Sequence, residues 1–268
     1  MKYKMLVLDM DDTLLTDDHE ISNENKEMLL KAQELGVYVV LASGRPTPAM
    51  ISYAKDLQLH TNNSYIISYN GAVITDLKED EILFEQTLTQ DQIHALYDYS
   101  VKSKTHIITY IDGKVVSETS SEYIDVELNI TGLEHNKVVS FKDYVQSSAI
   151  KCILLEEPSY LKEVEKELKA AMPHLSICMS KPFFLEVAQN GIDKANSIKF
   201  LAEKLNILQS EIIAVGNAGN DLTMVQYAGL GVWVDNVDSE LRHHADVIVA
   251  SNNNHGVAEV VRRFILNS

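Results

Sequence analysis

Short runs of consecutive apolar residues alternate with helix-patterned segments, and this alternation limits the possible folds more than any other feature of the sequence. The first third holds an apolar run from Met5 to Leu8, apolar residues at helical spacing from Ser22 to Leu35, and a second run from Val37 to Ala42. Strands that are apolar at successive positions need both faces buried, as in a parallel sheet with helices on each side. We therefore predict an α/β protein with a doubly wound parallel sheet.

The same alternation returns near the carboxyl end, with a predicted helix over 193–205, strands over 212–216, 231–234 and 247–249, and a last helix over 257–266. The middle differs. Thr89 to Gln92 has the form of a capping box, Asp112-Gly113 fits a hairpin turn, and a helix over 158–171 lies between strands over 150–155 and 183–187. We predict a core domain of residues 1–82 and 189–268, with an inserted α+β domain over 83–188.

The charge balance limits the partners. Lys and Arg total 23 against 39 Asp and Glu, a formal charge of −16, which repels an extended phosphate backbone and makes nucleic acid an unexpected partner. A small phosphorylated substrate is still compatible with this charge, because a few cations close to the substrate outweigh the negative charge of distant residues.

We expect no signal peptide, no membrane span, and a cytoplasmic protein in which Cys152 and Cys178 are buried thiols. The polar stretch 251–255 is expected to be an exposed loop.

Two aspartates directly follow the first predicted strand. Asp9 and Asp11 stand at its carboxyl end, where open α/β sheets bind ligands, and two carboxylates at this spacing can converge on one cation. Such a cation would keep Asp9 anionic as a nucleophile and leave Asp11 to act as acid and base. An acidic loop that only caps the next helix explains the pair equally well.

Further polar residues stand at corresponding places along the chain. Ser43-Gly44-Arg45 follows the second strand and precedes a helix, where backbone donors suit a phosphate, although a capping serine needs no function. Lys194 opens another helix, where a nearby anion would explain a lysine, but a solvated side chain would also account for it. The loop from Asn217 to Asp221 offers oxygen ligands that suit magnesium, or forms an ordinary turn.

Taken together and in this order, the four elements resemble the motifs of the haloacid dehalogenase superfamily. With Ser68-Tyr69-Asn70-Gly71-Ala72 shortly before the insertion, the chain resembles the Cof-type phosphatases with a type IIB cap, over nearly its whole length. The resemblance implies a Rossmann-like core and a cap that closes over the site, excludes water and contributes specificity. It also implies a magnesium-dependent phosphatase acting on small phosphorylated metabolites, such as sugar phosphates.

The resemblance assigns roles to individual positions. Asp9 would become an aspartyl phosphate, and Asp11 would protonate the leaving group and later activate water. Magnesium would be held by the Asp9 carboxylate, the Asp11 carbonyl and the Asn217 side chain, with Asp221 in support. The phosphate oxygens would be bound by the groups that donate hydrogen bonds or carry positive charge, namely the amides of Met10 and Gly44, the Ser43 hydroxyl, Lys194 and the Asn220 amide. Arg45 would reach either a substrate group or an acidic partner in the core.

The sequence departs from the family pattern at two positions. Asp12 replaces the usual glycine after the second aspartate, and Asn217 replaces the usual aspartate of the last motif. The first change adds a carboxylate beside the site. The second removes a negative charge, so we expect weaker metal binding than in relatives that carry aspartate.

Competing interpretations remain open at this point. A phosphotransferase such as a phosphosugar mutase would pass the phosphoryl group to a second hydroxyl, and Asn217 also fits a catalytically weakened protein that binds a phosphorylated ligand. A receiver-like signalling domain also phosphorylates an aspartate, but such domains are smaller and have no place for the insertion. Histidines 94, 106, 135 and 174 and Trp233 are interpreted as structural or surface residues.

Overall fold

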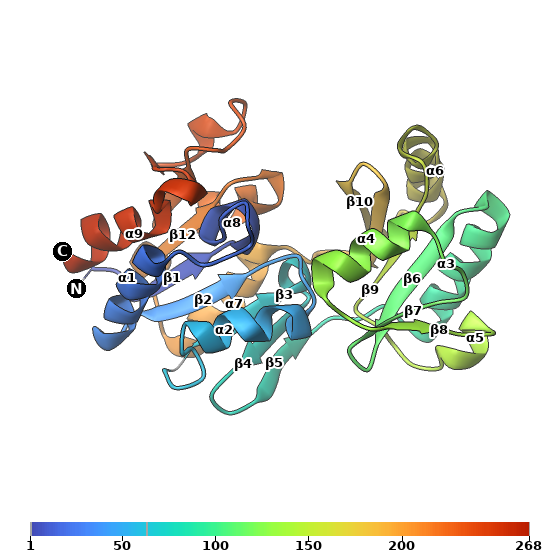
Figure 1. Ribbon diagram of the computed structural model, residues 1–268, viewed down its shortest axis with the longest axis horizontal. Helices are drawn as coiled ribbons and strands as arrows, with labels where there is room; N and C mark the ends of the chain where they lie inside the picture. The colour runs from blue at the N-terminus through green and yellow to red at the C-terminus, as the bar shows by residue number, and fades with distance from the viewer. Residues whose placement is uncertain (1, 63, 268) are drawn as a thin grey trace. The chain divides into compact units, whose positions relative to one another are not determined.

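The computed structural model describes residues 2–62 and 64–267, which form two compact units (Figure 1). The first unit comprises residues 1–84 and 193–268, and the second comprises residues 85–192. The first unit is therefore built from both ends of the chain.

An eight-stranded sheet forms the centre of the first unit, in the order β14-β13-β12-β1-β2-β3-β4-β5. The strands from β14 to β3 pair in parallel, as predicted, whereas β4 turns back antiparallel to β3. The strands are β1 (Met5–Leu8), β2 (Tyr38–Ala42), β3 (Tyr65–Ser68), β4 (Val73–Asp76), β5 (Glu81–Glu85), β12 (Ile212–Gly216), β13 (Leu230–Val234) and β14 (Val247–Val249). The α/β class predicted from the apolar runs is confirmed.

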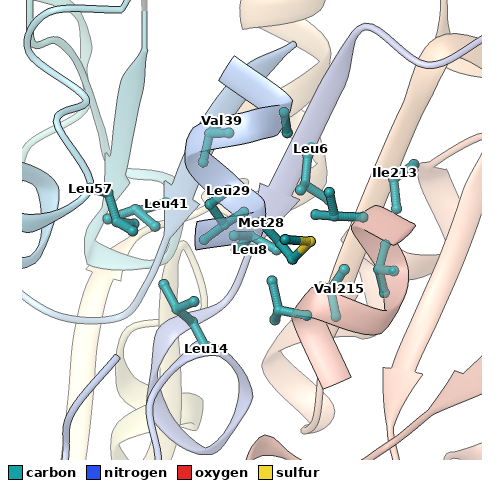
Figure 2. Close-up of a cluster of buried hydrophobic side chains, with 14 of the residues drawn as sticks. Leu6, Leu8, Leu14, Met28, Leu29, Val39, Leu41, Leu57, Ile213 and Val215 are labelled. Atoms are coloured by element: carbon teal, nitrogen blue, oxygen red, sulfur yellow. The ribbon is translucent and has the colours of Figure 1, made fainter. Parts of the chain in front are cut away.

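Both faces of this sheet are buried, which is why its strands are apolar at consecutive positions. Leu6 and Leu8 of β1 pack into one hydrophobic cluster with Met28 and Leu29 of α1 (Figure 2). Val7, on the opposite face, packs with residues of α7 and α8. The helices of this unit are α1 (Asn23–Glu34), α2 (Ile51–Asp56), α7 (Lys194–Leu205), α8 (Leu222–Tyr227) and α9 (Gly256–Val261).

The second unit is an α+β structure with a six-stranded sheet in the order β10-β11-β9-β6-β7-β8. Its strands pair antiparallel except for β7 with β8. The elements are α3 (Gln90–Ser103), β6 (His106–Ile111), β7 (Lys114–Ser117), α4 (Glu122–Thr131), β8 (His135–Lys137), α5 (Phe141–Tyr144), β9 (Lys151–Leu155), α6 (Pro158–Ala171), β10 (Leu175–Lys181) and β11 (Phe184–Gln189). The capping box at Thr89 is present, and Asp112-Gly113 forms the β6–β7 turn with positive φ at both residues.

Two sequence expectations are wrong in detail. Cys152 is buried in β9, but Cys178 is exposed, because β10 is an edge strand that turns alternate residues Leu175 and Ile177 inward and leaves Cys178 outward. Asn252 was expected in an exposed loop, yet it is only 1% exposed and donates a hydrogen bond to the Leu15 carbonyl.

The last helix covers the expected span. Helix α9 (Gly256–Val261) continues directly into a π-helical turn over Arg262–Leu266. Trp233 lies fully in the core and donates its ring N–H to the Leu241 carbonyl, as a structural residue should. Within residues 2–62 and 64–267, no helix has the length and apolar character needed to cross a bilayer.

The second unit buries charged side chains beside its sheet. Glu127 of α4 accepts a hydrogen bond from the Tyr110 hydroxyl, and Lys151 pairs with Glu186 at 2.9 Å. Glu127 is only 6% exposed, and this burial raises the pKa of its carboxyl above the ordinary value, although the charge of Lys151 and the Tyr110 hydrogen bond oppose the shift. The folded protein therefore holds a proton on Glu127 more readily than the unfolded chain does.

We expect Glu127→Gln to alter how stability depends on pH. In the wild type, the contribution of the protonated carboxyl is complete below the unfolded pKa and is lost as pH rises through the raised folded pKa. The glutamine cannot titrate, so the melting temperature of the wild type relative to the variant should fall as pH rises above the ordinary pKa of a glutamate. Thermal unfolding monitored by circular dichroism would measure it, with exposed Glu122→Gln of the same helix as control. A difference that is constant with pH would contradict the prediction.

Candidate active site

The carboxyl ends of three neighbouring strands bring the predicted motifs together. Strand β1 lies between β12 and β2 in parallel register, with Leu8 opposite Val215 and Leu41. Asp9 follows Leu8, and its backbone N–H donates to the Val215 carbonyl at 3.0 Å, so the sheet ladder fixes the position of this residue. The segments that begin with Ser43 and Asn217 leave the sheet at the same edge, where open α/β sheets bind ligands.

A buried lysine bridges two aspartates at this edge. The Lys194 Nζ donates to Asp9 Oδ1 at 2.6 Å and to Asp221 Oδ1 at 2.7 Å. Lys194 is 1% exposed, Asp9 5% and Asp221 0%, which excludes the solvated surface lysine that its sequence position also allowed. Three ionisable groups buried in this way remain in the fold only because each has a charged partner.

One cation shared between two carboxylates leaves the cluster short of positive charge. Burial and the negative charge of Asp221 raise the pKa of Asp9 to about 7, although Lys194 acts in the opposite direction. Burial disfavours the charged form of Lys194, but the two aspartates outweigh this effect and raise the pKa of its ammonium. Lys194 therefore stays cationic, and a further cation or a proton would complete the charge balance.

Asp221 also holds the loop that follows β12. Its Oδ2 accepts hydrogen bonds from the backbone N–H groups of Asn217 and Ala218, at 3.0 and 3.2 Å. Its carboxylate lies so close to Gly216 that a Cβ at that glycine would stand 2.5 Å from the Asp221 Cβ. Only glycine fits there without displacing Asp221, so this glycine serves close packing.

The loop after β12 contacts the turn after β1 through one side-chain hydrogen bond. The Thr13 hydroxyl donates to Asn217 Oδ1 at 3.1 Å. This hydrogen bond brings Asn217, the residue that replaces the usual aspartate of the family, next to the Asp9–Asp11 segment. Its amide oxygen keeps a second lone pair for another partner.

Arg45 makes a two-point ion pair with Asp11. Its Nε and Nη2 donate to the two carboxylate oxygens of Asp11 at 2.9 and 2.6 Å, and its guanidinium lies 5.4 Å from the centre of the Tyr53 ring. Of the two partners expected for Arg45, the acidic one is present. The side chain of Asp11 is 42% exposed, whereas that of Arg45 is 8% exposed, so the carboxylate remains open to solvent on one side.

Asn70 joins two of the predicted phosphate-binding positions, and the sequence analysis did not assign it a role. Its side-chain amide lies against Gly44, and its Oδ1 accepts from the Asn220 side chain at 3.4 Å. Its backbone N–H donates to the Ser43 carbonyl, with Asn70 itself at a φ of 56°. The Asn-Gly pair at 70–71 was the available signal, because this dipeptide favours positive φ.

The residues next to the two aspartates have different surroundings. The Met10 side chain is buried in the core, which leaves its backbone as the part that can face a ligand. The Ser43 hydroxyl accepts from the Arg45 N–H at 3.1 Å and does not cap a helix. Asp12 has a φ of 56°, the left-handed region where glycine is least strained, which accounts for the glycine that relatives are expected to carry.

Several oxygen atoms at this site suit a hard cation such as magnesium. Asp9 Oδ2 forms no hydrogen bond within residues 2–62 and 64–267, and Asn217 Oδ1 retains acceptor capacity. Asp221 has both oxygens engaged, and the Asp11 carboxylate is held by Arg45, so Asp11 would offer its backbone carbonyl. No group of three or more His, Cys, Asp or Glu side chains in the described part of the chain is arranged to hold a metal ion. The donor set thus mixes carboxylate, amide and carbonyl oxygens.

The sequence model of the haloacid dehalogenase-like hydrolases matches residues 6–261. The chain belongs to this family. YxeH of Bacillus subtilis (strain 168) is 33% identical, over 98% of this chain and 99% of its own length. The 5-amino-6-(5-phospho-D-ribitylamino)uracil phosphatase YcsE of the same organism is 32% identical, over 98% of this chain and 96% of YcsE. A crystal structure of a haloacid dehalogenase-like hydrolase from Bacteroides thetaiotaomicron matches with a TM-score of 0.94 at 33% identity, covering 98% of this chain and 100% of the other.

These likenesses confirm the family that the four motifs indicated. Together with the fold, they identify this haloacid dehalogenase-like hydrolase as an enzyme of the phosphatase class that acts on phosphorylated substrates.

We expect Lys194→Met to destabilise the first unit strongly. The variant leaves Asp9 and Asp221 buried without a cation, and breaking a buried pair from one side typically costs about 3–5 kcal/mol. Denaturant unfolding followed by fluorescence of Trp233, which lies in the same unit, would measure the loss. Exposed Lys199→Met of the same helix is the control, and equal losses in both variants would refute the expectation.

Proposed function

We propose that this enzyme is a magnesium-dependent phosphatase that hydrolyses small phosphorylated metabolites, such as sugar phosphates, through an aspartyl phosphate on Asp9. The observation that carries the proposal is the buried Lys194 bridge between Asp9 and Asp221 at the carboxyl edge of the sheet. It fixes one carboxylate oxygen of Asp9 beside a permanent cation. The second oxygen is left to attack phosphorus.

The first half of the reaction transfers the phosphoryl group to Asp9. Asp9 Oδ2 forms a bond to phosphorus while the bond from phosphorus to the ester oxygen breaks, and Asp11 gives its proton to the departing alkoxide. Lys194 stands next to the site of attack and offsets negative charge on the phosphoryl oxygens. Arg45 orients the Asp11 carboxyl through two hydrogen bonds.

The second half releases inorganic phosphate. Asp11, now a carboxylate, takes a proton from a water molecule whose oxygen attacks phosphorus, and the bond from phosphorus to Asp9 breaks. The phosphate oxygens are bound by donors from the neighbouring loops, which are the amides of Met10 and Gly44, the Ser43 hydroxyl, Lys194 and the Asn220 side chain. Positioning and charge neutralisation of this kind account for most of the catalysis in phosphoryl transfer.

Magnesium fits the oxygen donors of this site. We assign its binding to the Asp9 carboxylate, the Asp11 carbonyl and the Asn217 side chain, with Asp221 in support because it fixes the Asn217 loop. When bound, the ion neutralises charge on the phosphoryl group. The Lys194 ammonium and the ion would then share the Asp9 carboxylate.

The unit of residues 85–192 is assigned as the cap, which excludes water and contributes to substrate choice. The name of YcsE describes an enzyme acting on a phosphorylated ribityl group, which supports a phosphomonoester on a small sugar or polyol as the substrate class here. We also propose a cytoplasmic location, which the two free cysteines support.

We expect Asp9→Asn to abolish hydrolysis of p-nitrophenyl phosphate. The amide cannot act as the nucleophile, so the rate in saturating magnesium should fall by about a thousandfold or more. Release of p-nitrophenol would be followed by absorbance, with and without chelator, and exposed Asp18→Asn is the matched control. Undiminished metal-dependent release by the Asp9 variant would disprove the nucleophile. No release from the wild type would favour a binding protein, and transfer of phosphate to an added sugar would favour a mutase.

We expect Asn217→Asp to bind magnesium more tightly than the wild type. The substitution restores a carboxylate among the oxygen donors, and one added charge should lower the midpoint of a magnesium titration by about tenfold. Both the activity midpoint and the rise of melting temperature with magnesium would report it, so the measurement does not depend on turnover. Exposed Asn254→Asp adds the same charge elsewhere. An unchanged or weaker midpoint in Asn217→Asp would contradict the metal assignment.

A further inference from the structure

Three asparagine side chains hold the turn that carries Asp11. The turn covers Met10–Leu14 and continues to Leu15. Asn236 Nδ2 donates to the Asp12 carbonyl at 2.7 Å. Asn25 Nδ2 donates to the Leu14 carbonyl at 3.4 Å, and Asn252 Nδ2 donates to the Leu15 carbonyl at 3.1 Å. We call these three residues, Asn25, Asn236 and Asn252, the asparagine clamp.

The clamp is itself anchored to the core. The Asn252 N–H donates to Asn236 Oδ1 at 3.1 Å, so two of its members hold each other. Asn25 Oδ1 accepts from the Ala258 N–H at 2.9 Å, which ties it to α9. Asn25 is 0% exposed and Asn252 is 1% exposed, whereas Asn236 lies at the surface. The clamp thus connects the buried packing around α9 to the turn that carries Asp11.

The turn needs external partners because its backbone is not helical throughout. Asp11 is extended, with a ψ of 129°, and Asp12 is left-handed, with a φ of 56°. Aspartate enters that region more readily than most residues other than glycine but still at a cost, and hydrogen bonds to the turn offset this cost. A change of conformation at Asp12 would move its neighbours Asp11 and Thr13, which contact Arg45 and Asn217.

We propose that the asparagine clamp positions the catalytic turn, and that Asn236 does so by holding the Asp12 carbonyl in the left-handed conformation. Asn236 is then a positioning residue that acts through Asp12 on the placement of Asp9 and Asp11. This inference rests on the catalytic roles proposed for those two aspartates. It also explains how the chain accommodates an aspartate at a position suited to glycine.

The test uses Asn236 because its removal leaves the buried part of the clamp in place. Asn236→Asp keeps an oxygen for the Asn252 N–H but has no donor for the Asp12 carbonyl, and Asn236→Ala removes both hydrogen bonds without adding charge. Asn254→Asp, which adds the same charge to an exposed loop, is the control. Loss of a hydrogen bond that positions an active-site group from outside typically lowers activity by about 10–100-fold.

We expect kcat of both Asn236 variants to fall by about tenfold with little change in KM or melting temperature, while Asn254→Asp behaves as the wild type. Adding Asp12→Gly should restore most of the loss, because glycine adopts positive φ without a partner. A purely structural role would lower the melting temperature and would not be rescued. Unchanged kcat in both variants, with an active wild type, would overturn the inference and leave the proposed function intact.

Hydrogen exchange gives a result even if the wild type proves inactive. The Leu15 N–H closes the turn on the Met10 carbonyl at 2.9 Å, so its exchange reports whether the turn is held. We expect faster exchange of this amide in Asn236→Ala than in the wild type, and normal exchange once Asp12→Gly is added. Equal exchange in the wild type and Asn236→Ala would overturn the inference, whatever the fate of the proposed function.

Discussion

The structure of the site depends on one buried ammonium between two buried carboxylates. Lys194 arrives from the amino end of α7, Asp9 from the end of β1 and Asp221 from the loop after β12, and their hydrogen bonds join three segments far apart in sequence. Each of these charges would be too costly to bury alone. Their mutual neutralisation therefore allows a charged site to exist inside an apolar sheet and fixes which oxygen of Asp9 stays available.

The same cluster organises its surroundings. Asp221 uses its second oxygen to fasten the backbone of the Asn217 loop, and Gly216 provides the space for it. Arg45 holds the Asp11 carboxylate, so both aspartates of the first motif meet a cation from elsewhere in the chain. The carboxylates are thus paired before any ligand arrives, and a bound cation would compete with partners that are already present.

Much of the fold could be predicted because a sheet that is buried on both faces requires strands with apolar residues at consecutive positions. Consecutive apolar residues such as Met5 to Leu8 marked the central strands. The exposed position of Cys178 could not be predicted, because an edge strand and a central strand share the same local pattern and differ only in their neighbours. The burial of Asn252 was hidden for a similar reason, since its partner Leu15 lies far away in sequence.

The sequence by itself determined the order of the motifs, the family and the residue types available for phosphoryl chemistry. Tertiary structure decided which of them meet, because side-chain contacts depend on register and on the packing of distant segments. It paired Arg45 with Asp11, placed Thr13 on Asn217, and brought Asn70 between the two predicted phosphate-binding loops. Asp12 adopts the left-handed conformation that suits glycine best, and Asn236, far away in sequence, donates a hydrogen bond to its carbonyl.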